Sequence, residues 1–367
     1  MAQLPIGVDI GTTAVRMLQL AGGERDLRVV EAGKFVISRQ DGTEADRRRE
    51  AVVAGIRRLL KERRFRGRQT VMALAPEQAA VRNIRMPLMD PAEFDGAVHW
   101  EAQNKFPFDT ATAVIQYQRA GRVRQGDEVL EEVIVFAAPR VEVESRIHLA
   151  SEAGLTLVSL DAEPCTLFRG FERFLRRRED EEVVSVMVDI GARTRVVISR
   201  GREVVFVKTI PIGGTVFNRA VAECLELEPA EAEALRRRIG ARAADADGSD
   251  EPDRAVRAVA DAIRPHLEDL ADEIGLCLRY YGVTFRAPWP EKIQLTGGEA
   301  HNPTIPSALG ESLEVTVEVA DPFRRARTDH LGPVLDRRAV QAEWATAFGL
   351  SLKGLHLDQG LSSHYAA

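Results

Sequence analysis

Two copies of the tetrapeptide Val-Asp-Ile-Gly mark the organisation of this chain. They lie in IGVDIGTTAVRMLQL (residues 6–20) and in VMVDIGARTRVVISR (residues 186–200). In each stretch an apolar strand ends at an Asp, Asp9 or Asp189, and a Gly then opens a turn into a second apolar strand. Because one copy opens each half of the 367 residues, the sequence predicts two lobes built on the same plan.

Length, composition and charge narrow the class of protein. A chain of 367 residues is long for one core, so we expect two or more compact lobes. The hydrophobic content of 45% and the charged content of 29% are typical of a globular protein. The net charge of -6 argues against nucleic acid as the main partner, because phosphate backbones bind basic faces.

We expect neither a targeting segment nor a membrane span. No apolar run approaches the length that crosses a bilayer, and the N-terminus leads into a strand without a basic leader or a hydrophobic signal segment. We therefore expect a cytoplasmic protein. The cysteines, Cys165, Cys224 and Cys277, are isolated from one another and odd in number, so we expect neither a disulfide nor a cysteine metal site.

The first half predicts a meander of three strands followed by an inserted unit. Apolar strands at 6–10, 15–20 and 27–37 are separated by a Gly-Thr-Thr turn and a Gly-Gly turn. A basic helix and a further strand follow. Residues 76–154 then show the order strand, helix, strand, strand, helix, a β-α-β-β-α unit that can bury a core of its own. The basic run in the helix is interpreted as a solvated face, with anionic lipid or an acidic partner as the alternative.

The second half repeats the hairpins and then turns helical. Strands at 183–190, 195–199 and 203–210 precede two helices, a polar stretch at 241–255 expected to be a flexible loop, and a long helix at 255–282. A strand ending in Thr-Gly-Gly and a closing helix at 343–355 follow, and the last dozen residues are expected to be disordered.

The predicted fold class is therefore α/β, in two pseudo-symmetric lobes. A dinucleotide-binding fold is excluded, because Gly11 opens a hairpin where that fold needs a helix. The predicted division gives residues 1–75 and 155–180 to the first lobe, 76–154 to the inserted subdomain, 181–218 and 290–353 to the second lobe, 219–289 to a helical subdomain, and 354–367 to a tail.

The two Val-Asp-Ile-Gly turns predict a site for phosphate. Consecutive backbone amides on a tight turn make a concave anion site that needs no side-chain charge. If the turns after Asp9 and Asp189 face each other across a cleft, they can hold the β- and γ-phosphates of a nucleotide. Two carboxylates beside a polyphosphate would repel it, and a hydrated Mg2+ would resolve the conflict. The alternative, simple strand-turn-strand punctuation, does not explain two copies at matching places.

A third element supports the same interpretation. The strand IQLTGG ends in Thr296, Gly297 and Gly298. A pair of glycines lets the backbone approach a ligand closely, as contact with adenosine and the α-phosphate requires. An ordinary strand-to-helix turn remains the alternative.

These stretches resemble the actin-like ATPases, and among them the PilM family of type IV pilus assembly proteins. The resemblance runs from Ile6 to about Leu355. It is carried by the two Val-Asp-Ile-Gly loops, by FDGAVHWEAQNKFPFD (94–109) in the inserted unit, by TIPIGG (209–214), and by PAEAEALRRR (229–238). It implies two duplicated ribonuclease-H-like lobes with the inserted β-α-β-β-α subdomain in the first.

The resemblance also implies roles for particular residues. Asp9 and Asp189 would order Mg2+ through its waters, and Glu163 would face the γ-phosphate or the attacking water. The nucleotide, ATP, would be held by Asp9, Gly11, Thr12, Thr13, Arg16, Asp189, Gly191, Thr194, Gly213, Gly214, Glu233, Arg236, Gly297 and Gly298.

The chain departs from the family pattern at a few positions. Arg16 stands where the family commonly has Lys, which keeps the charge but not the geometry. Arg193 and Arg195 replace small or hydroxylic residues and can either reach phosphate or crowd it. Glu299 replaces a third Gly beside the nucleotide.

The implied partner is the N-terminal cytoplasmic peptide of a PilN-like inner-membrane protein. The resemblance implies that this peptide lies in a groove beside the inserted subdomain, lined by Trp100, Phe106 and Phe108. The alternative is that these residues pack in the core of the subdomain, since aromatic residues at helical spacing are usually core.

Three classes of function stay open. The first is a nucleotide-binding scaffold at the inner membrane, at most a slow ATPase, for a type IV pilus or type II secretion-like machine. The second is an FtsA-like cell-division scaffold, which would need a terminal amphipathic helix. The third is a small-molecule kinase, for which Asp161 and Glu163 are the carboxylates to consider as a base.

Overall fold

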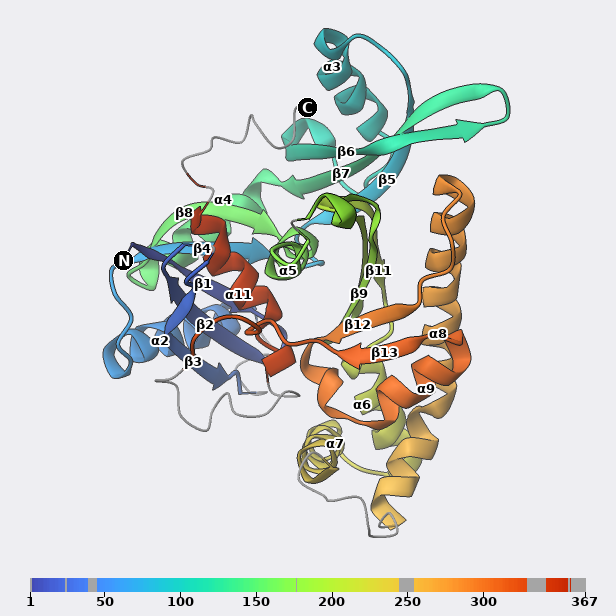
Figure 1. The fold of residues 1–367 in the computed structure, drawn as a ribbon. Helices are drawn as coiled ribbons and strands as arrows, with labels where there is room; N and C mark the ends of the chain where they lie inside the picture. The colour runs from blue at the N-terminus through green and yellow to red at the C-terminus, as the bar shows by residue number, and fades with distance from the viewer. Residues whose placement is uncertain are drawn as a thin grey trace.

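The computed structural model describes residues 2–23, 25–38, 45–175, 177–243, 254–328, 341–355 and 357. Three β-sheets with helices around them form an α/β molecule (Figure 1). Among the described helices, none is long and apolar enough to cross a membrane. The predicted disordered tail and most of the predicted polar loop lie outside the described residues.

The first sheet contains the predicted meander. Its strands, in spatial order, are β3 (Arg28–Val36), β2 (Ala14–Ala21), β1 (Gln3–Ile10), β4 (Gln69–Leu74) and β8 (Thr156–Ala162). The pairs β3–β2 and β2–β1 are antiparallel, whereas β4 and β8 add in parallel. Because β1 is the central strand and is buried along nearly its whole length, it is almost uniformly apolar up to Asp9.

The second sheet repeats this topology. Its strands, in spatial order, are β11 (Glu203–Ile210), β10 (Thr194–Arg200), β9 (Val184–Ile190), β12 (Lys292–Thr296) and β13 (Thr316–Val319). The hairpin strands are again antiparallel, and β12 and β13 are parallel to β9. Strand β13 was not predicted from the sequence, since TVEV is short and half polar. The two tetrapeptides thus end the central strand of each sheet.

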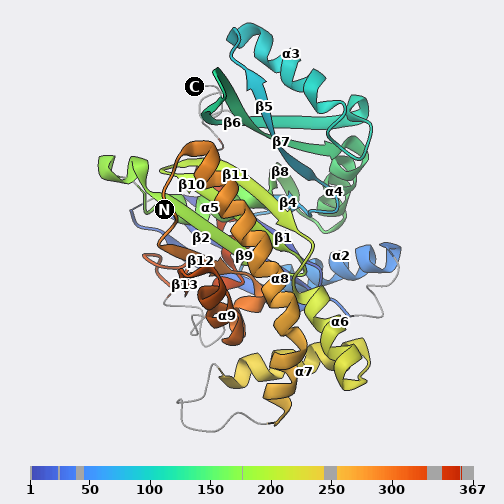
Figure 2. The same ribbon diagram turned by 90° about the vertical axis from the view of Figure 1, so that its right-hand side faces the viewer.

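Helices of the second lobe lie against and below its sheet. They are α6 (Gly214–Leu225), α7 (Pro229–Ala243), α8 (Arg254–Phe285) and α9 (Thr304–Leu313). Both ends of the polar stretch predicted as a loop are helical, because α7 continues to Ala243 and α8 begins at Arg254. Figure 2 shows α8 running along the lobe from the region of α7 up to the inserted sheet.

The inserted unit has the predicted order of elements and a core of its own. It consists of β5 (Ala80–Pro87), α3 (Pro91–Ala102), β6 (Ala113–Gln125), β7 (Glu128–Pro139) and α4 (Arg140–Glu152), with the sheet order β5-β7-β6. Phe94 and Val98 of α3 are fully buried against this antiparallel sheet. Its strand β5 also reaches the second lobe, since the Asn83 amide donates to the Val207 carbonyl at 2.8 Å.

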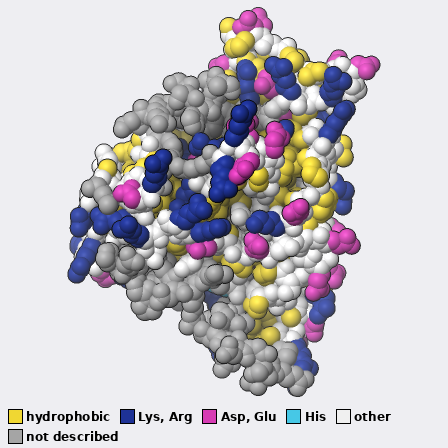
Figure 3. All heavy atoms as spheres, in the orientation of Figure 1, with side chains coloured by type: hydrophobic (Ala, Val, Ile, Leu, Met, Phe, Trp, Pro, Cys, Tyr) yellow, Lys and Arg dark blue, Asp and Glu magenta, His cyan; other side chains and the backbone are white. Residues whose placement is uncertain are grey.

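The basic helix α2 (Ala45–Glu62) turns its apolar side inward. Val52, Ile56 and Leu59 are buried against the first sheet, whereas Arg57 and Arg58 are exposed. On the face that Figure 3 shows, Lys and Arg side chains are spread out and interspersed with Asp and Glu. The structure thus agrees with a solvated basic face and does not test an acidic or lipid partner.

The closing helix α11 (Ala345–Leu352) belongs to the first lobe, unlike in the predicted division, which placed residues 290–353 in the second. Ser351 donates to the Pro5 carbonyl at 2.7 Å and accepts from the Leu20 amide at 3.1 Å. Phe348 joins the cluster of Leu18 and Leu20. The physical reason is that this face of the first sheet would otherwise be uncovered, and an apolar helix from the chain end covers it. The other predicted boundaries remain proposals.

The contact between α11 and α5 (Glu163–Glu172) generates a prediction. A Cβ on Gly349 would lie 1.7 Å from the Thr166 carbonyl oxygen, so Gly349→Ala must push the helices apart. We expect it to lower the free energy of unfolding by about 2 kcal/mol. Gly96→Ala in the exposed part of α3, where a Cβ meets nothing within 4 Å, should gain up to about 1 kcal/mol. Urea unfolding measures both, and equal stabilities would contradict this packing.

Candidate functional site

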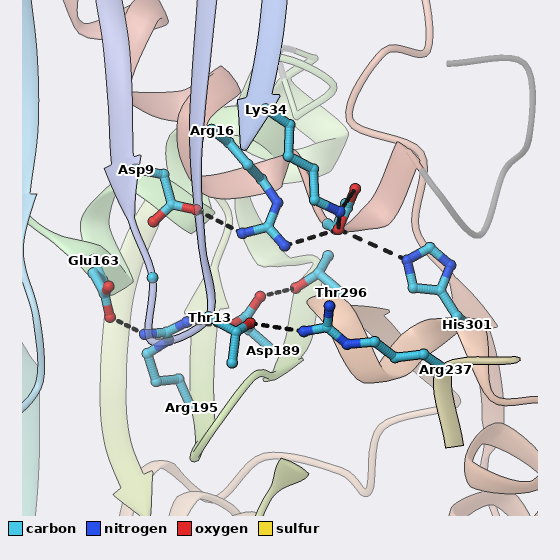
Figure 4. A network of polar contacts seen from close by, with 12 residues as sticks. Asp9, Thr13, Arg16, Lys34, Glu163, Asp189, Arg195, Arg237, Thr296 and His301 are labelled. Carbon is cyan, nitrogen blue, oxygen red and sulfur yellow. Dashed lines mark hydrogen bonds and ion pairs between the residues drawn. The ribbon is translucent and has the colours of Figure 1, made fainter. Parts of the chain in front are cut away.

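A cleft of about 400 Å³ separates the two lobes. The turn after β1, the turn after β9, the end of β12 and one side of α7 all contribute to its wall. Its charged lining is nearly balanced: the cations are Arg16, Lys34, Arg193, Arg195, Arg236 and Arg237, and the anions are Asp9, Glu77, Glu163, Asp189, Glu233, Glu299 and Glu343. The two halves of the sequence therefore meet at one polar site (Figure 4).

Hydrogen bonds fix the turn after β1. The Gly11 amide donates to the Ala14 carbonyl at 3.0 Å. Arg48 of α2 donates to the carbonyls of Gly11 and Thr12 at 2.8 and 2.9 Å, and the Thr13 carbonyl accepts from the Ile37 amide. The loop carbonyls, which would repel an anion, are thus already engaged.

The turn after β9 is closed in the same way. The Gly191 amide donates to the Arg193 carbonyl at 3.0 Å, and the Gly191 carbonyl accepts from the Gly214 amide at 2.8 Å. A Cβ on Gly213 would lie 2.8 Å from the Gly191 and Ala192 carbonyl oxygens. Gly213 is therefore needed for the close approach of α6 to this turn.

In each lobe an arginine on the second strand of the hairpin lies opposite the aspartate near the end of the first strand. On the β1–β2 hairpin Asp9 pairs in register with Arg16, and on the β9–β10 hairpin Asp189 pairs with Arg195. Arg16 lies 3.4 Å from the Asp9 carboxylate, and Arg195 forms a close ion pair with Asp189. The duplication thus includes a cation beside each aspartate, which the sequence analysis did not recognise.

Burial makes these cations necessary. Burial raises the pKa of Asp9 and raises that of Asp189 to about 6, and in both cases Arg16 opposes the rise. The charge on Asp9 adds to the increase at Asp189. Two buried carboxylates in one site would disfavour each other's ionisation, so the guanidinium groups help both to stay charged at neutral pH.

Arg195 also bridges the lobes. Besides Asp189, it pairs with Glu163, which begins α5 of the first lobe. The side chain of Arg195 is only 14% exposed. Glu163 lies in the cleft as predicted, and one oxygen of its carboxylate pairs with Arg195.

A second buried cluster surrounds Glu343, just before α11. Its carboxylate accepts from Arg16 at 2.8 Å and from Lys34 at 2.7 Å, and His301 lies 3.9 Å away. Burial acts to raise the pKa of Glu343, but these cations outweigh it and hold the pKa well below its ordinary value. Nothing in the local sequence marked Glu343, Lys34 or His301, because their elements are far apart along the chain.

Helix α7 closes the other end of the cleft. The buried Arg236 forms a close ion pair with Glu299 and donates to the Asn218 side chain at 2.6 Å. Glu299, a departure from the family pattern, is thus neutralised by Arg236. Arg236 therefore neutralises Glu299, and its implied role in holding the nucleotide stays a prediction.

The next arginine of α7 joins the two lobes. Arg237 pairs with Glu233 at 2.7 Å and donates to the Thr13 hydroxyl at 3.0 Å. The basic run of α7 was visible in the sequence, but which of its arginines faces the first loop was not.

The structure brings most of the predicted nucleotide residues together. Those that line the cleft are Asp9, Gly11, Thr12, Thr13, Arg16, Glu163, Asp189, Gly191, Gly214, Glu233, Arg236, Gly297 and Gly298. Thr194 and Gly213 are not part of the lining. Thr194 is fully buried and donates to the Ile212 carbonyl at 2.7 Å, so both residues shape the second turn from behind.

The predicted partner residues fall into two groups. Trp100 is 70% exposed on α3. Phe106 and Phe108 stack on each other, with ring centroids 5.7 Å apart, and pack against the core of the inserted unit. The two phenylalanines therefore act at least partly as core, and only Trp100 presents a large free surface.

The two aspartates do not fit the magnesium site that the resemblance implied. A hydrated Mg2+ needs carboxylate oxygens that can accept from its waters. Asp189 already accepts from Thr296 on one oxygen and pairs with Arg195 on the other, and Asp9 pairs with Arg16. A guanidinium group thus already contacts one carboxylate oxygen of each aspartate.

The Glu343 cluster generates a prediction about stability. Glu343→Gln leaves Arg16 and Lys34 without their shared anion, so we expect a loss of about 3 kcal/mol at neutral pH. The folded-state pKa of Glu343 lies below its ordinary value of 4.5. Its charge therefore stabilises the fold above that value, and the contribution is lost as the pH falls toward the folded-state pKa.

Denaturant unfolding of both proteins between neutral and acidic pH tests this. The difference in stability between the native protein and Glu343→Gln should shrink as the pH falls below about 4.5. A difference that stays constant with pH would contradict the assigned ion pairs.

Known proteins show the same architecture. The family model "Type IV pilus assembly protein PilM" matches residues 7–355. A solved chain of a PilM-PilN type IV pilus biogenesis complex is similar over 96% of this chain and 98% of its own, with 26% identity and a TM-score of 0.78. No curated protein sequence matches the chain.

Two more distant structures share the fold. The ethanolamine utilization protein EutJ from Carboxydothermus hydrogenoformans is 15% identical with a TM-score of 0.55, over 96% of this chain and 90% of its own. MreB5 of Spiroplasma citri bound to ADP is 11% identical with a TM-score of 0.53, over 98% of both chains. The fold is therefore that of the actin-like ATPases, and since the family model spans nearly the whole sequence, the chain belongs to the PilM family of type IV pilus assembly proteins.

Proposed function

We propose that this chain binds ATP between its lobes and acts as an assembly scaffold of a type IV pilus or related secretion machine. It would work on the cytoplasmic side of the inner membrane and hold the N-terminal cytoplasmic peptide of a PilN-like protein. Membership of the PilM family supports the machine, and the similar chain from a PilM-PilN complex supports the partner.

One observation carries the nucleotide part of the proposal. Two turns of the same sequence end the central strands of two equivalent sheets and face one cleft. The cleft volume of about 400 Å³ is within the range of small-molecule sites. Arg16 and Arg236 both line the cleft, and among the described residues their buried Nε atoms have no hydrogen-bond partner.

The proposed function uses no metal. Asp9 and Asp189, which the resemblance assigned to Mg2+, hold guanidinium groups. Under this proposal Arg16, Arg195 and Arg237 supply positive charge near the phosphates.

A kinase is less well supported by the same cleft. A kinase base must be a carboxylate that can take a proton from its substrate. Asp161 is buried between Arg169 at 2.7 Å and Lys353 at 3.2 Å. Burial alone would raise the pKa of Asp161. Arg169 and Lys353 outweigh this effect and keep the pKa below its ordinary value. Since Glu163 is also paired, we expect binding with at most slow hydrolysis.

Contacts between the inserted subdomain and the second lobe support a scaffold whose shape depends on nucleotide. The fully buried Glu132 of β7 accepts from Tyr280 of α8 at 2.6 Å and from Arg85 of β5 at 3.0 Å. Arg85 also donates to Thr284 of α8 at 3.1 Å. We name this cluster the Glu132 clasp. Because it joins α8 to the inserted sheet, a movement of the lobes on nucleotide binding would reach the proposed partner groove.

The cleft generates a prediction about binding. A Cβ on Gly298 would meet nothing within 4 Å of it in the protein, and Gly298 lines the cleft. Gly298→Val should therefore fold normally but fill the space proposed for the nucleoside, weakening ATP binding at least about tenfold, or 1.4 kcal/mol. Calorimetric titration with ATP gives the affinity, and the melting temperature serves as the control for folding. Unchanged affinity in a folded variant would place ATP elsewhere.

The Glu132 clasp generates a second prediction. Tyr280→Phe removes one donor to the buried Glu132, so we expect a loss of about 1 to 2 kcal/mol of stability. We also expect ATP to change the affinity for the PilN-like peptide less in this variant than in the native protein.

Tyr281→Phe is the matched control for the clasp. The Tyr281 hydroxyl is buried, and among the described residues it has no hydrogen-bond partner. We expect this variant to keep both its stability and the effect of ATP on peptide affinity. Titrations of the PilN-like peptide with and without ATP measure this effect in both variants. If ATP changes the peptide affinity of Tyr280→Phe as much as that of the native protein, the Glu132 clasp does not connect the cleft to the partner groove.

A further inference from the structure

Arg195 is placed where a cation is needed, between two carboxylates of different lobes. Glu163 comes from the first lobe and Asp189 from the second, and both are less than 10% exposed. The guanidinium pairs with both at once. Without it, two buried anions would face each other with no counter-charge between them.

The register of the hairpin keeps Arg195 in this place. Arg195 lies directly opposite Asp189 on neighbouring antiparallel strands, where side chains on one face are within reach of each other. Its neighbour Thr194 is fully buried and bonded to the Ile212 carbonyl. The strand on both sides of the turn is therefore fixed, and Arg195 is held by backbone geometry as well as by its ion pairs.

A guanidinium and a hydrated divalent ion would compete for the same oxygens. The guanidinium has five donors in a planar fork that suits two carboxylates. A hydrated Mg2+ needs acceptors for its water ligands in the same space. As long as Arg195 occupies it, like charges also oppose the entry of the ion.

We propose that Arg195 takes the place of the magnesium ion in this cleft, so that ATP binds with little dependence on Mg2+. This inference rests on the proposed nucleotide function and specifies the chemical form of the ligand, which is ATP without a bound metal. Arg195 is then the residue that determines whether the site needs a metal, and its loss would create a need for one.

The test compares ATP titrations in excess Mg2+ and in excess chelator, for the native protein and for Arg195→Gln. For the native protein we expect the two dissociation constants to agree within about threefold. For Arg195→Gln we expect at least about tenfold weaker binding in chelator than in Mg2+, because a divalent ion must then supply the missing charge. Strong dependence on Mg2+ in the native protein, or no new dependence in Arg195→Gln, would overturn the inference.

Arg200→Gln is the matched control. Arg200 lies at the far end of the same strand, away from the cleft, where it pairs with the exposed Glu182. We expect this variant to bind ATP as the native protein does, with and without Mg2+. If Arg195→Gln does not fold, Arg195→Lys keeps the charge and should bind ATP with as little dependence on Mg2+ as the native protein, and strong dependence on Mg2+ in either protein would overturn the inference.

A measurement without ATP separates this inference from the proposed function. Mg2+ alone should leave the melting temperature of the native protein unchanged. It should raise that of Arg195→Gln, because Glu163 and Asp189 are then free to hold the ion. A native protein that binds no ATP would reject the proposed function, and the effect of Mg2+ on the variant would still decide whether Arg195 stands in for the metal. No such effect would overturn the inference.

Discussion

Two aspartates are buried together at the ends of the central strands of two sheets, and the site depends on how their charge is compensated. Asp9 and Asp189 are 8% and 3% exposed, burial raises the pKa of both, and the charge on Asp9 raises that of Asp189 further. The duplication of the chain makes this unavoidable, because the two lobes present the same strand end to the same cleft. Arg16 and Arg195, each opposite its aspartate in the adjacent strand, are the compensation that the structure provides.

The same cations connect the lobes. Arg195 reaches from the second lobe to Glu163 in the first, and Arg237 reaches from α7 to Thr13. On the other side of the molecule, the Glu132 clasp joins α8 to the inserted sheet. These polar contacts lie beside an apolar cluster in which Leu167 and Phe168 of α5 pack together with the core of the second lobe. The relative position of the lobes is therefore set by apolar packing together with the polar contacts at both places.

The sequence predicted much of the fold because its signals were local. Hairpins, glycine turns and the order of elements in residues 76–154 follow from periodicity and turn chemistry, and both tetrapeptides lie at strand ends as expected. What the sequence could not show was set by packing between distant segments. Helix α11 covers the first sheet although it follows the second lobe in the chain, and β13 is too short and too polar to be recognised.

The same distinction applies to the site. Most of the glycines and both aspartates could be placed in the cleft from their motifs. Glu343 could not, because its partners Arg16 and Lys34 precede it by some three hundred residues. Arg195 was visible as a departure from the family pattern, but only the register of β9 and β10 shows that it faces Asp189. The resemblance implied a metal at this point, whereas the charge that compensates each aspartate here belongs to the chain itself.

The most direct test of this account is a crystal structure of the protein grown with ATP and Mn2+, with anomalous scattering used to locate the metal. The account predicts a triphosphate between the turns at Gly11 and Gly191, Arg195 still bridging Glu163 and Asp189, and no anomalous peak between the two aspartates. A manganese ion between Asp9 and Asp189, with Arg195 turned away, would show that the metal and not the arginine completes the site.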